Sequence, residues 1–330
     1  GLNIIDWFAI LITIILQTLF FTVGMQYNKK IINFSAMTVY AGMLIFFFVV
    51  LLSDVKITTE AFSSIFNLNN FLDVNNLAPL ITVAGTIFAY FSILIISFGD
   101  FSRYVKNEQE LKKGNLSLIL NLIIFSFLSV FIVIGSDVFL NQKFSDIDRI
   151  FTNPTDIVGK FDNIQITIVV LFFIIIASAS TNLVANFIPS QYSLINFAPS
   201  ILSLKSASYL IAFFGLLIAI FWLTILSQIG ILSFVDTFGA FFGPLFGVMA
   251  ADYYLIKNQE LSNKDLYSID KESAYYYSGG WHIKGVYSLI IGFIFSASTI
   301  WNTNLMFLQS YAWIIGAFVA WITYYLLAKK

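Results

Sequence analysis

The sequence predicts an all-α polytopic membrane protein. Hydrophobic residues make up 59% of the chain and charged residues only 11%, whereas soluble domains are about half apolar and about a quarter charged. The mean hydropathy of +0.87 agrees with this imbalance. Crossing the hydrocarbon core takes about 20 consecutive apolar residues per helix, and stretches of that length recur along the chain.

Windows of membrane-spanning length predict nine transmembrane helices within a single domain that covers residues 1–330. The approximate ranges of these helices are 7–25, 33–53, 77–98, 116–136, 166–187, 207–227, 231–254, 284–302 and 307–327. The segments between them are short, apart from two polar loops on one side and one loop rich in tyrosine on the other.

The distribution of basic residues tests this arrangement, because cytoplasmic loops are enriched in lysine and arginine. Assigning alternate loops to one side gives that side 13 of the 17 basic residues, namely Lys29, Lys30, Arg103, Lys106, Lys112, Lys113, Lys205, Lys257, Lys264, Lys271, Lys284, Lys329 and Lys330. The other side receives Lys56, Lys143, Arg149 and Lys160. The richer side is therefore predicted to be cytoplasmic, together with the C-terminus.

The same topology bears on the start of the chain. Residue 1 falls on the outer side, directly before a span, and neither an initiator methionine nor a signal peptide precedes it. If the complete protein has a cytoplasmic N-terminus, an odd number of spans is missing. We therefore interpret the chain as a fragment.

Composition argues against several functional classes. The formal net charge of −1 argues against nucleic-acid binding, which usually shows a basic patch. The chain has no cysteine, so it has no disulfide, thiolate nucleophile or Cys-ligated metal. The only histidine, His282, lies in a predicted cytoplasmic loop, where we expect it to be solvated. An intramembrane enzyme needs a nucleophile–base pair or a metal constellation, and few residues remain to build one.

The stretch "ASASTNLVAN" at residues 177–186 places polar side chains in an apolar helix. At helical spacing Ala177, Ser180 and Thr181 share one face, and Asn182 and Asn186 share another. Such groups often join helices by hydrogen bonds, each worth about 0.6 kcal/mol. Hydroxyl and carbonyl oxygens also suit a small hard cation, and an amide suits a heterocycle edge. Helix packing and ligand binding both remain open on this evidence.

The span 77–98 contains a second feature. Gly85, Thr86 and Ser92 weaken the predicted helix near its middle, and transporters commonly place substrates beside interrupted helices. Tyr90 and Phe91 adjoin this region. Their rings either stack on a planar substrate or are ordinary buried aromatics.

The span 231–254 contains glycines at every fourth position, Gly239, Gly243 and Gly247. This spacing predicts a smooth face for close helix packing. Pro244 lies in the same span and frees a backbone carbonyl. A packed, bendable helix also suits a gate.

Charged residues near the predicted membrane boundaries are few. Asp236 is the most deeply embedded carboxylate, about one turn inside the outer boundary, where it either has a function or reaches water. Asp100 and Arg103 are spaced as an i, i+3 ion pair in "GDFSRYVKN", at the end of the span 77–98.

Four stretches together resemble the nucleobase–cation symport family one. They are "GDFSRYVKN", "STNLVAN", "FFGPLFGVMAADYYLIKNQEL" and "DLY" followed by "YYYSGGW", in an order and spacing that match through the whole chain. The tyrosine-rich tail is most similar to the hydantoin and allantoin branch. The resemblance implies a leucine-transporter-like fold with a five-plus-five inverted repeat and two extra helices, of which the nine spans are helices four to twelve.

The resemblance also implies site residues. Ala177, Ser180 and Thr181 match the family's sodium ligands on helix eight. The remaining sodium ligands and a second stacking aromatic belong to helices one and three of the family. Sodium, or alternatively protons, is therefore the expected coupling ion, and no other cofactor is expected.

For the substrate, Asn186 and Asn182 match the family's binding amides. Phe91 matches the position of a stacking aromatic on helix six, and Tyr90 lies where a smaller residue is common. These matches predict a planar amide heterocycle, of the allantoin, hydantoin, uracil or cytosine class, as the small-molecule partner.

The expected function is therefore secondary transport by a monomer in the cell's inner membrane, surrounded by lipid and without nucleic acid. An amino-acid or amine symporter of the same fold is the alternative, and it would lack an aromatic sandwich. A purely structural subunit is a further alternative, and it would tolerate alanine at Asn186.

Overall fold

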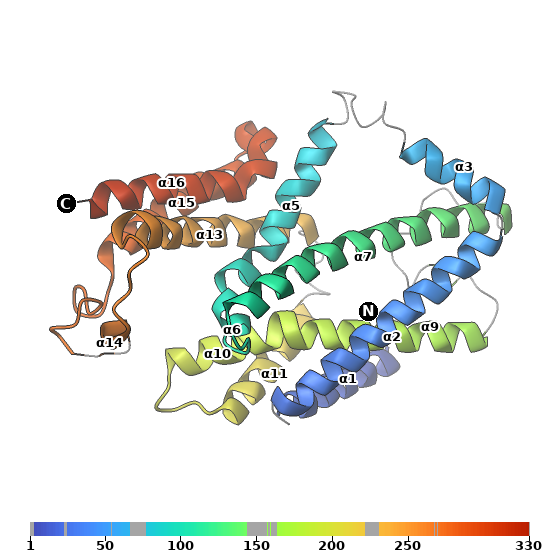
Figure 1. Ribbon diagram of the computed structural model, residues 1–330, viewed down its shortest axis with the longest axis horizontal. Helices are drawn as coiled ribbons and strands as arrows, with labels where there is room; N and C mark the ends of the chain where they lie inside the picture. The colour runs from blue at the N-terminus through green and yellow to red at the C-terminus, as the bar shows by residue number, and fades with distance from the viewer. Residues whose placement is uncertain are drawn as a thin grey trace. The chain divides into compact units, whose positions relative to one another are not determined.

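The computed structural model describes residues 3–22, 25–53, 55–66, 77–143, 157, 159, 164–221, 231–266, 268 and 270–329. These residues form helices and loops, with one isolated antiparallel bridge between Ser278 and Trp281 (Figure 1). Within the described residues, eight helices are long and apolar enough to span a membrane, and Ile4–Phe20 is a shorter apolar helix. The all-α polytopic prediction is confirmed.

A described helix overlaps each of the nine predicted spans, as the following ranges show. They are α1 (Ile4–Thr22), α2 (Met25–Ser53), α5 (Leu77–Ile96), α7 (Glu108–Lys143), α9 (Ile164–Thr181), α11 (Leu204–Phe221), α13 (Ile231–Ala251), α15 (Ile283–Trp301) and α16 (Ala312–Ala328). Helix α9 continues through the π-helix η2 (Asn182–Phe187) into α10 (Ile188–Phe197), and α13 continues into the π-helix η4 (Asp252–Ile256). The 3₁₀-helix η5 (Thr303–Tyr311) precedes α16, and the short helices are α3 (Val55–Ile65), α6 (Phe98–Ser102) and α14 (Asn263–Leu266). The predicted end of the span 207–227 lies outside the described residues.

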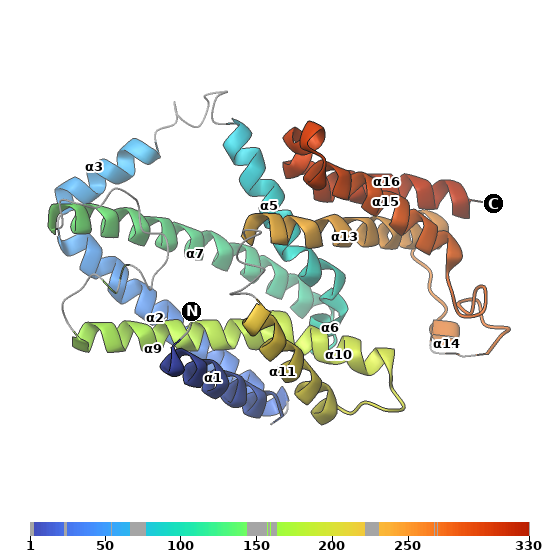
Figure 2. The same ribbon diagram turned by 180° about the vertical axis from the view of Figure 1, so that it is seen from behind.

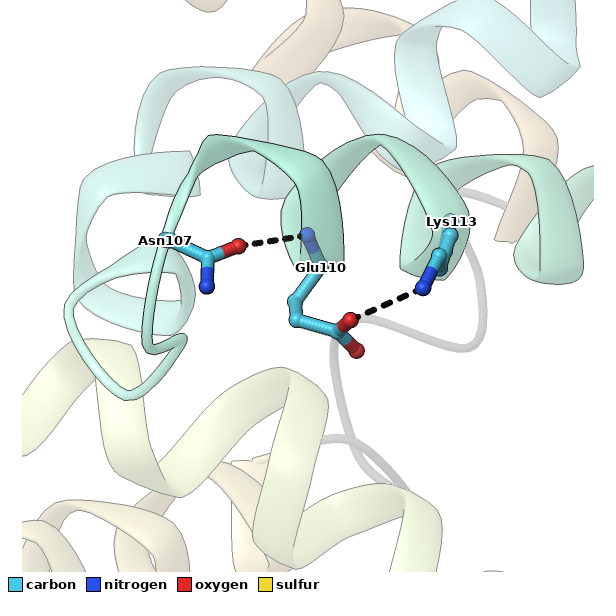
Figure 3. A network of polar contacts seen from close by, with 3 residues as sticks. All are labelled: Asn107, Glu110 and Lys113. Atoms are coloured by element: carbon cyan, nitrogen blue, oxygen red, sulfur yellow. Dashed lines mark hydrogen bonds and ion pairs between the residues drawn. The ribbon is translucent and has the colours of Figure 1, made fainter.

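Helix α7 begins at Glu108, earlier than the apolar window at 116 predicts. Asn107 caps this end, because its Oδ1 accepts a hydrogen bond of 3.0 Å from the backbone N–H of Glu110 (Figure 3). Lys113 lies 3.0 Å from the Glu110 carboxylate, and Lys112 lies 2.7 Å from Glu108. Hydropathy detects only the part of a helix that is apolar, so the predicted range omits the polar residues 108–115 at the start of α7.

The chain divides into two compact units. Unit 1 comprises residues 1–72 and 100–219, and unit 2 comprises residues 73–99 and 220–330. In unit 1, α2 packs against α7 and α9, and α1 contacts η2 (Figures 1 and 2). In unit 2, α13, α15 and α16 pack against one another, and α5 packs against α13.

The glycine face of α13 allows the close packing in unit 2. A Cβ atom at Gly243 or Gly247 would collide with the backbone carbonyl of Trp313 or Ala317 on α16. A Cβ atom at Gly239 would collide with α5. The predicted smooth face is therefore a contact surface that a methyl group would disrupt.

Asp236 on α13 is buried, with 8% of its surface exposed. Its Oδ2 accepts a hydrogen bond of 2.7 Å from Nε2 of Gln309 on η5. The carboxylate therefore attaches η5 to α13 within unit 2.

His282 is not simply solvated, so that prediction is wrong. Its ring is partly buried and stacks on Tyr277, with centroids 4.0 Å apart and an interplanar angle of 13°. Its Nε2 lies 3.3 Å from the hydroxyl oxygen of Tyr324 on α16. Burial lowers the pKa of the His282 imidazole, and Lys257 and Lys284 lower it further, against the opposing charge of Asp252. The tyrosine-rich loop is therefore attached to the C-terminal helix through this imidazole.

Candidate functional site

The hydroxyl face lies at the end of α9, in unit 1. The Ser180 hydroxyl donates a hydrogen bond of 3.1 Å to the carbonyl oxygen of Ala177. Thr181, the last residue of α9, is exposed. The structure therefore brings two of the three predicted cation ligands into contact and places the third beside them on an accessible turn. Neutral oxygens of this kind suit a small hard cation, so these residues fit part of a sodium shell.

A π-helical turn follows these residues directly. Within η2 the bonding changes from i−4 to i−5, as shown by the hydrogen bond from the backbone N–H of Ile188 to the carbonyl of Leu183. Pro189 comes next and is buried. Because proline lacks a backbone N–H, position 189 cannot donate a helical backbone hydrogen bond, with or without the π-turn. The wide turn lies between the hydroxyl face and α10.

The two predicted amides lie on this wide turn and contact each other. Asn186 donates a hydrogen bond of 2.8 Å from Nδ2 to Oδ1 of Asn182. Asn182 in turn donates from Nδ2 to Oε1 of Gln17 on α1, at 2.7 Å. The structure therefore joins the predicted pair into a chain of three amides from two helices.

Gln17 is not among the predicted site residues. Its only sequence signal is a single amide in the largely apolar stretch "ILITIILQTLFF" of α1. Its partner lies 165 residues further along the chain. Only the packing of α1 against η2 connects them.

The opposite side of η2 is anchored in the core of unit 1. Leu183 and Phe187 are 2% and 3% exposed, and they pack with Ile32 of α2 and Ile211 of α11. This apolar contact holds η2 in one rotational position. Asn186 consequently remains exposed and Asn182 half-buried, so a ligand can reach the first amide while the second lies behind it.

The predicted stacking aromatics lie in unit 2, on α5. Tyr90 is 62% exposed and Phe91 is 37% exposed. Their rings contact each other edge to face, with centroids 5.2 Å apart. Both side chains are therefore accessible, in contrast to the buried aromatics of a helix core. The amides and hydroxyls belong to unit 1.

The predicted interruption of the span 77–98 is absent, because α5 is one continuous helix from Leu77 to Ile96. Gly85 instead permits close approach to the carbonyl of Ser310, and Ser92 is fully buried with its hydroxyl bonded to the carbonyl of Ala89 at 2.5 Å. These small and polar residues serve packing within unit 2. A helix can tolerate both without breaking, since glycine costs only about 1 kcal/mol in its interior.

The predicted ion pair between Asp100 and Arg103 is also wrong. The two ion pairs among the described residues are those at the start of α7. Arg103 instead lies over the ring of Tyr192 on α10, with its guanidinium carbon 4.5 Å from the centroid. Burial and the hydrogen bond to Tyr192 raise the pKa of Tyr104 to about 12. The segment after α6 is therefore attached to α10 through aromatic contacts.

Residues 1–325 match a family described as permease for cytosine/purines, uracil, thiamine, allantoin. The allantoin permease of Bacillus subtilis (strain 168) is 27% identical over 244 residues, which is 74% of this chain and 48% of that protein. The purine-uracil permease NCS1 of Arabidopsis thaliana is 25% identical over 255 residues, covering 73% of this chain and 41% of that protein. The chain spans about half the length of the curated relatives it matches.

A solved structure shares the fold. It is that of Mhp1, a nucleobase-cation-symport-1 family transporter in a closed conformation with bromovinylhydantoin bound. The TM-score is 0.69 at 19% identity, over 98% of this chain and 66% of Mhp1. This likeness confirms the predicted leucine-transporter-like architecture. The match over residues 1–325 places the chain, a multi-pass membrane protein, in the family of permeases for cytosine/purines, uracil, thiamine and allantoin, which are transporters and not enzymes.

Proposed function

We propose that the chain is part of a cation-coupled secondary transporter that moves a planar amide heterocycle by alternating access. The substrate class is that of allantoin, hydantoin, uracil and cytosine, as in the relatives named above. The observation that carries the proposal is the exposed amide of Asn186, which is held by Asn182 and follows the Ser180 and Thr181 hydroxyls by six and five residues on the same continuous helix.

The roles of the residues follow from their chemistry. Asn186 offers one acceptor and a remaining N–H, which together pair with the N–H and C=O groups on the edge of a lactam or ureide. Tyr90 and Phe91 offer exposed ring faces for stacking against a flat substrate. The aromatic faces favour a heterocycle over an aliphatic amino acid or amine.

The coupling ion is proposed to be sodium, with protons as the alternative. The Ala177 carbonyl and the hydroxyls of Ser180 and Thr181 would hold the cation, which supplies a positive charge at the end of α9. Because these ligands and the amides of η2 lie on one continuous helix, ordering one group orders the other. By thermodynamic reciprocity, cation and substrate then raise each other's affinity by the same factor.

The proposed location is the cell's inner membrane, with the C-terminus in the cytoplasm. It is supported by the 13 basic residues assigned to one side of the sequence-based topology against four on the other.

A ligand screen tests the proposal in the protein expressed from its complete coding sequence. Thermal shift and uptake are measured with allantoin, hydantoin, uracil, cytosine, leucine and betaine, each with and without sodium. We expect a response to at least one heterocycle that sodium strengthens. A response to leucine or betaine alone would identify an amino-acid or amine carrier, and no response to any heterocycle would refute the proposal.

A further inference from the structure

The three linked amides form a directed chain. Asn186 donates to Asn182, and Asn182 donates to Gln17. A primary amide has an acceptor oxygen at one end and two N–H donors at the other. The direction of each hydrogen bond therefore determines whether the next amide presents its oxygen or its NH₂ group. In this way the orientation of Gln17 on α1 determines the orientation of Asn186 at the exposed surface of η2.

Gln17 is the innermost member of this chain. It is partly buried on α1, and its Oε1 is the acceptor for Asn182 at 2.7 Å. With the NH₂ group of Asn182 turned towards Gln17, the Oδ1 of Asn182 is turned towards Asn186. The NH₂ group of Asn186 is consequently held against Asn182, and its Oδ1 accepts no hydrogen bond within the described part of the chain.

We propose that Gln17 is a positioning residue that orients Asn182 and thereby presents Oδ1 of Asn186 as an acceptor for a substrate N–H. The inference rests on the proposed function, and it assigns a substrate preference to that site. Substrates that offer a ring or ureide N–H at this edge are bound, and analogues that are alkylated at the same nitrogen are rejected. A buried amide without its partner costs free energy, so the correct orientation is maintained while Gln17 is in place.

Matched ligand series test this role in the protein expressed from its complete coding sequence. One series is uracil, 1-methyluracil and 3-methyluracil, with thymine as a control for added size at a carbon atom. The other is hydantoin with its 1-methyl, 3-methyl and 5-methyl derivatives. The readout is the ratio of dissociation constants between each N-methyl compound and its parent, which a purely structural role of Gln17 would leave unchanged.

Three variants test whether the acceptor oxygen of Gln17 determines this ratio. Gln17→Met keeps the length of the side chain and removes the acceptor. Gln17→Glu keeps an acceptor oxygen in both of its protonation states. Gln191→Met is the matched control, because Gln191 is another buried amide of unit 1, and it donates to the Leu204 carbonyl and the Ser208 hydroxyl at 2.9 Å.

We expect the parent to reject one N-methyl isomer by about tenfold, the size of one hydrogen bond, and to accept the C-methyl control. In Gln17→Met this ratio falls towards one, whereas Gln17→Glu and Gln191→Met keep it, the latter at a lower melting temperature. If Gln17→Met keeps the parent's ratio, the positioning role is wrong while the transport proposal stands. If Gln17→Glu loses the ratio, the direction of the amide chain is wrong. If the parent binds none of the heterocycles, allantoin and cytosine included, the proposed function and the positioning role are both overturned.

Discussion

The hydroxyl of Tyr324 donates a hydrogen bond of 2.5 Å to Oδ1 of Asp252, 72 residues earlier in the chain. This contact joins the last helix, α16, to the π-helix η4 at the end of α13. Tyr324 is 1% exposed, so water cannot replace the bond once it is lost. Removing this hydrogen bond therefore tests how much it contributes to the stability of unit 2.

Tyr324→Phe keeps the packed ring and removes the hydrogen bond. We expect the free energy of unfolding to fall by about 1.5–3 kcal/mol, the usual contribution of a hydrogen bond to a charged group. Denaturation in detergent measures this loss. Tyr325→Phe is the control, because the neighbouring ring stacks on Trp321 and its hydroxyl forms no hydrogen bond with the described residues. Equal losses in both variants would contradict the assigned role of the contact.

Gly247→Ala is expected to destabilise unit 2. The new Cβ collides with the carbonyl of Ala317 on α16, and overpacking of this kind costs about 1–3 kcal/mol. Gly215→Ala is the matched control on α11, because a Cβ there meets nothing within 4 Å, and alanine favours a helix. Melting temperatures should fall for the first variant and hold or rise for the second. A neutral Gly247→Ala would mean that α13 and α16 are not in close contact.

Stability should depend on pH through His282. The folded state lowers the pKa of this imidazole, so the unfolded chain takes up the proton first as pH falls below about 6.5. The stability contribution is thus complete above that pH and is lost as pH falls towards the lowered folded value. His282→Phe keeps a ring against Tyr277 and cannot titrate. We expect its melting temperature to decline less than the parent's between about pH 7.5 and about pH 5, and parallel profiles would refute the effect.

Asn186→Ala should weaken substrate binding by about tenfold or more, because it removes both the acceptor oxygen and the N–H donor that are proposed to pair with the heterocycle. Titration calorimetry with the best ligand of the screen measures the change. Ser193→Ala, at an exposed position on α10, is the control and should bind as the parent does. Unchanged affinity in Asn186→Ala would favour a structural role for the amide pair.

Ser180→Ala and Thr181→Ala should each reduce the dependence of substrate binding on sodium. Each variant removes one proposed ligand oxygen from a shell that accepts only oxygen donors of this type. Ser178→Ala, an exposed serine two residues away, is the control. Thr181→Ser should retain the response because it keeps the hydroxyl. Full sodium dependence in both alanine variants would exclude this face as the cation site.

The apolar windows predict where the helices lie, because spanning length and hydropathy are local properties of the sequence. They misplace the ends where polar turns extend a helix, as at Asn107 and Glu110 of α7. The contact between Asn182 and Asn186 is also predictable, since residues four apart on a helix are neighbours.

Other parts of the site depend on contacts that are not local. Gln17 meets Asn182 only because α1 packs against η2. Arg103 lies over the ring of Tyr192 because α10 brings that ring within reach. His282 is buried by Tyr277 and Tyr324, which a single loop sequence does not reveal. The π-turn itself depends on a backbone bonding pattern that side-chain periodicity does not encode.

That turn also holds one more residue than a regular α-helical turn would. Because the wider turn absorbs this residue, α10 keeps nearly the rotation relative to α9 that a regular α-helix would give it. Deleting a single residue within 182–187 would therefore restore regular α-helical bonding and leave Gln191 in place to bond Leu204 and Ser208. The extra residue thus alters the backbone only locally, at the turn that carries the two amides.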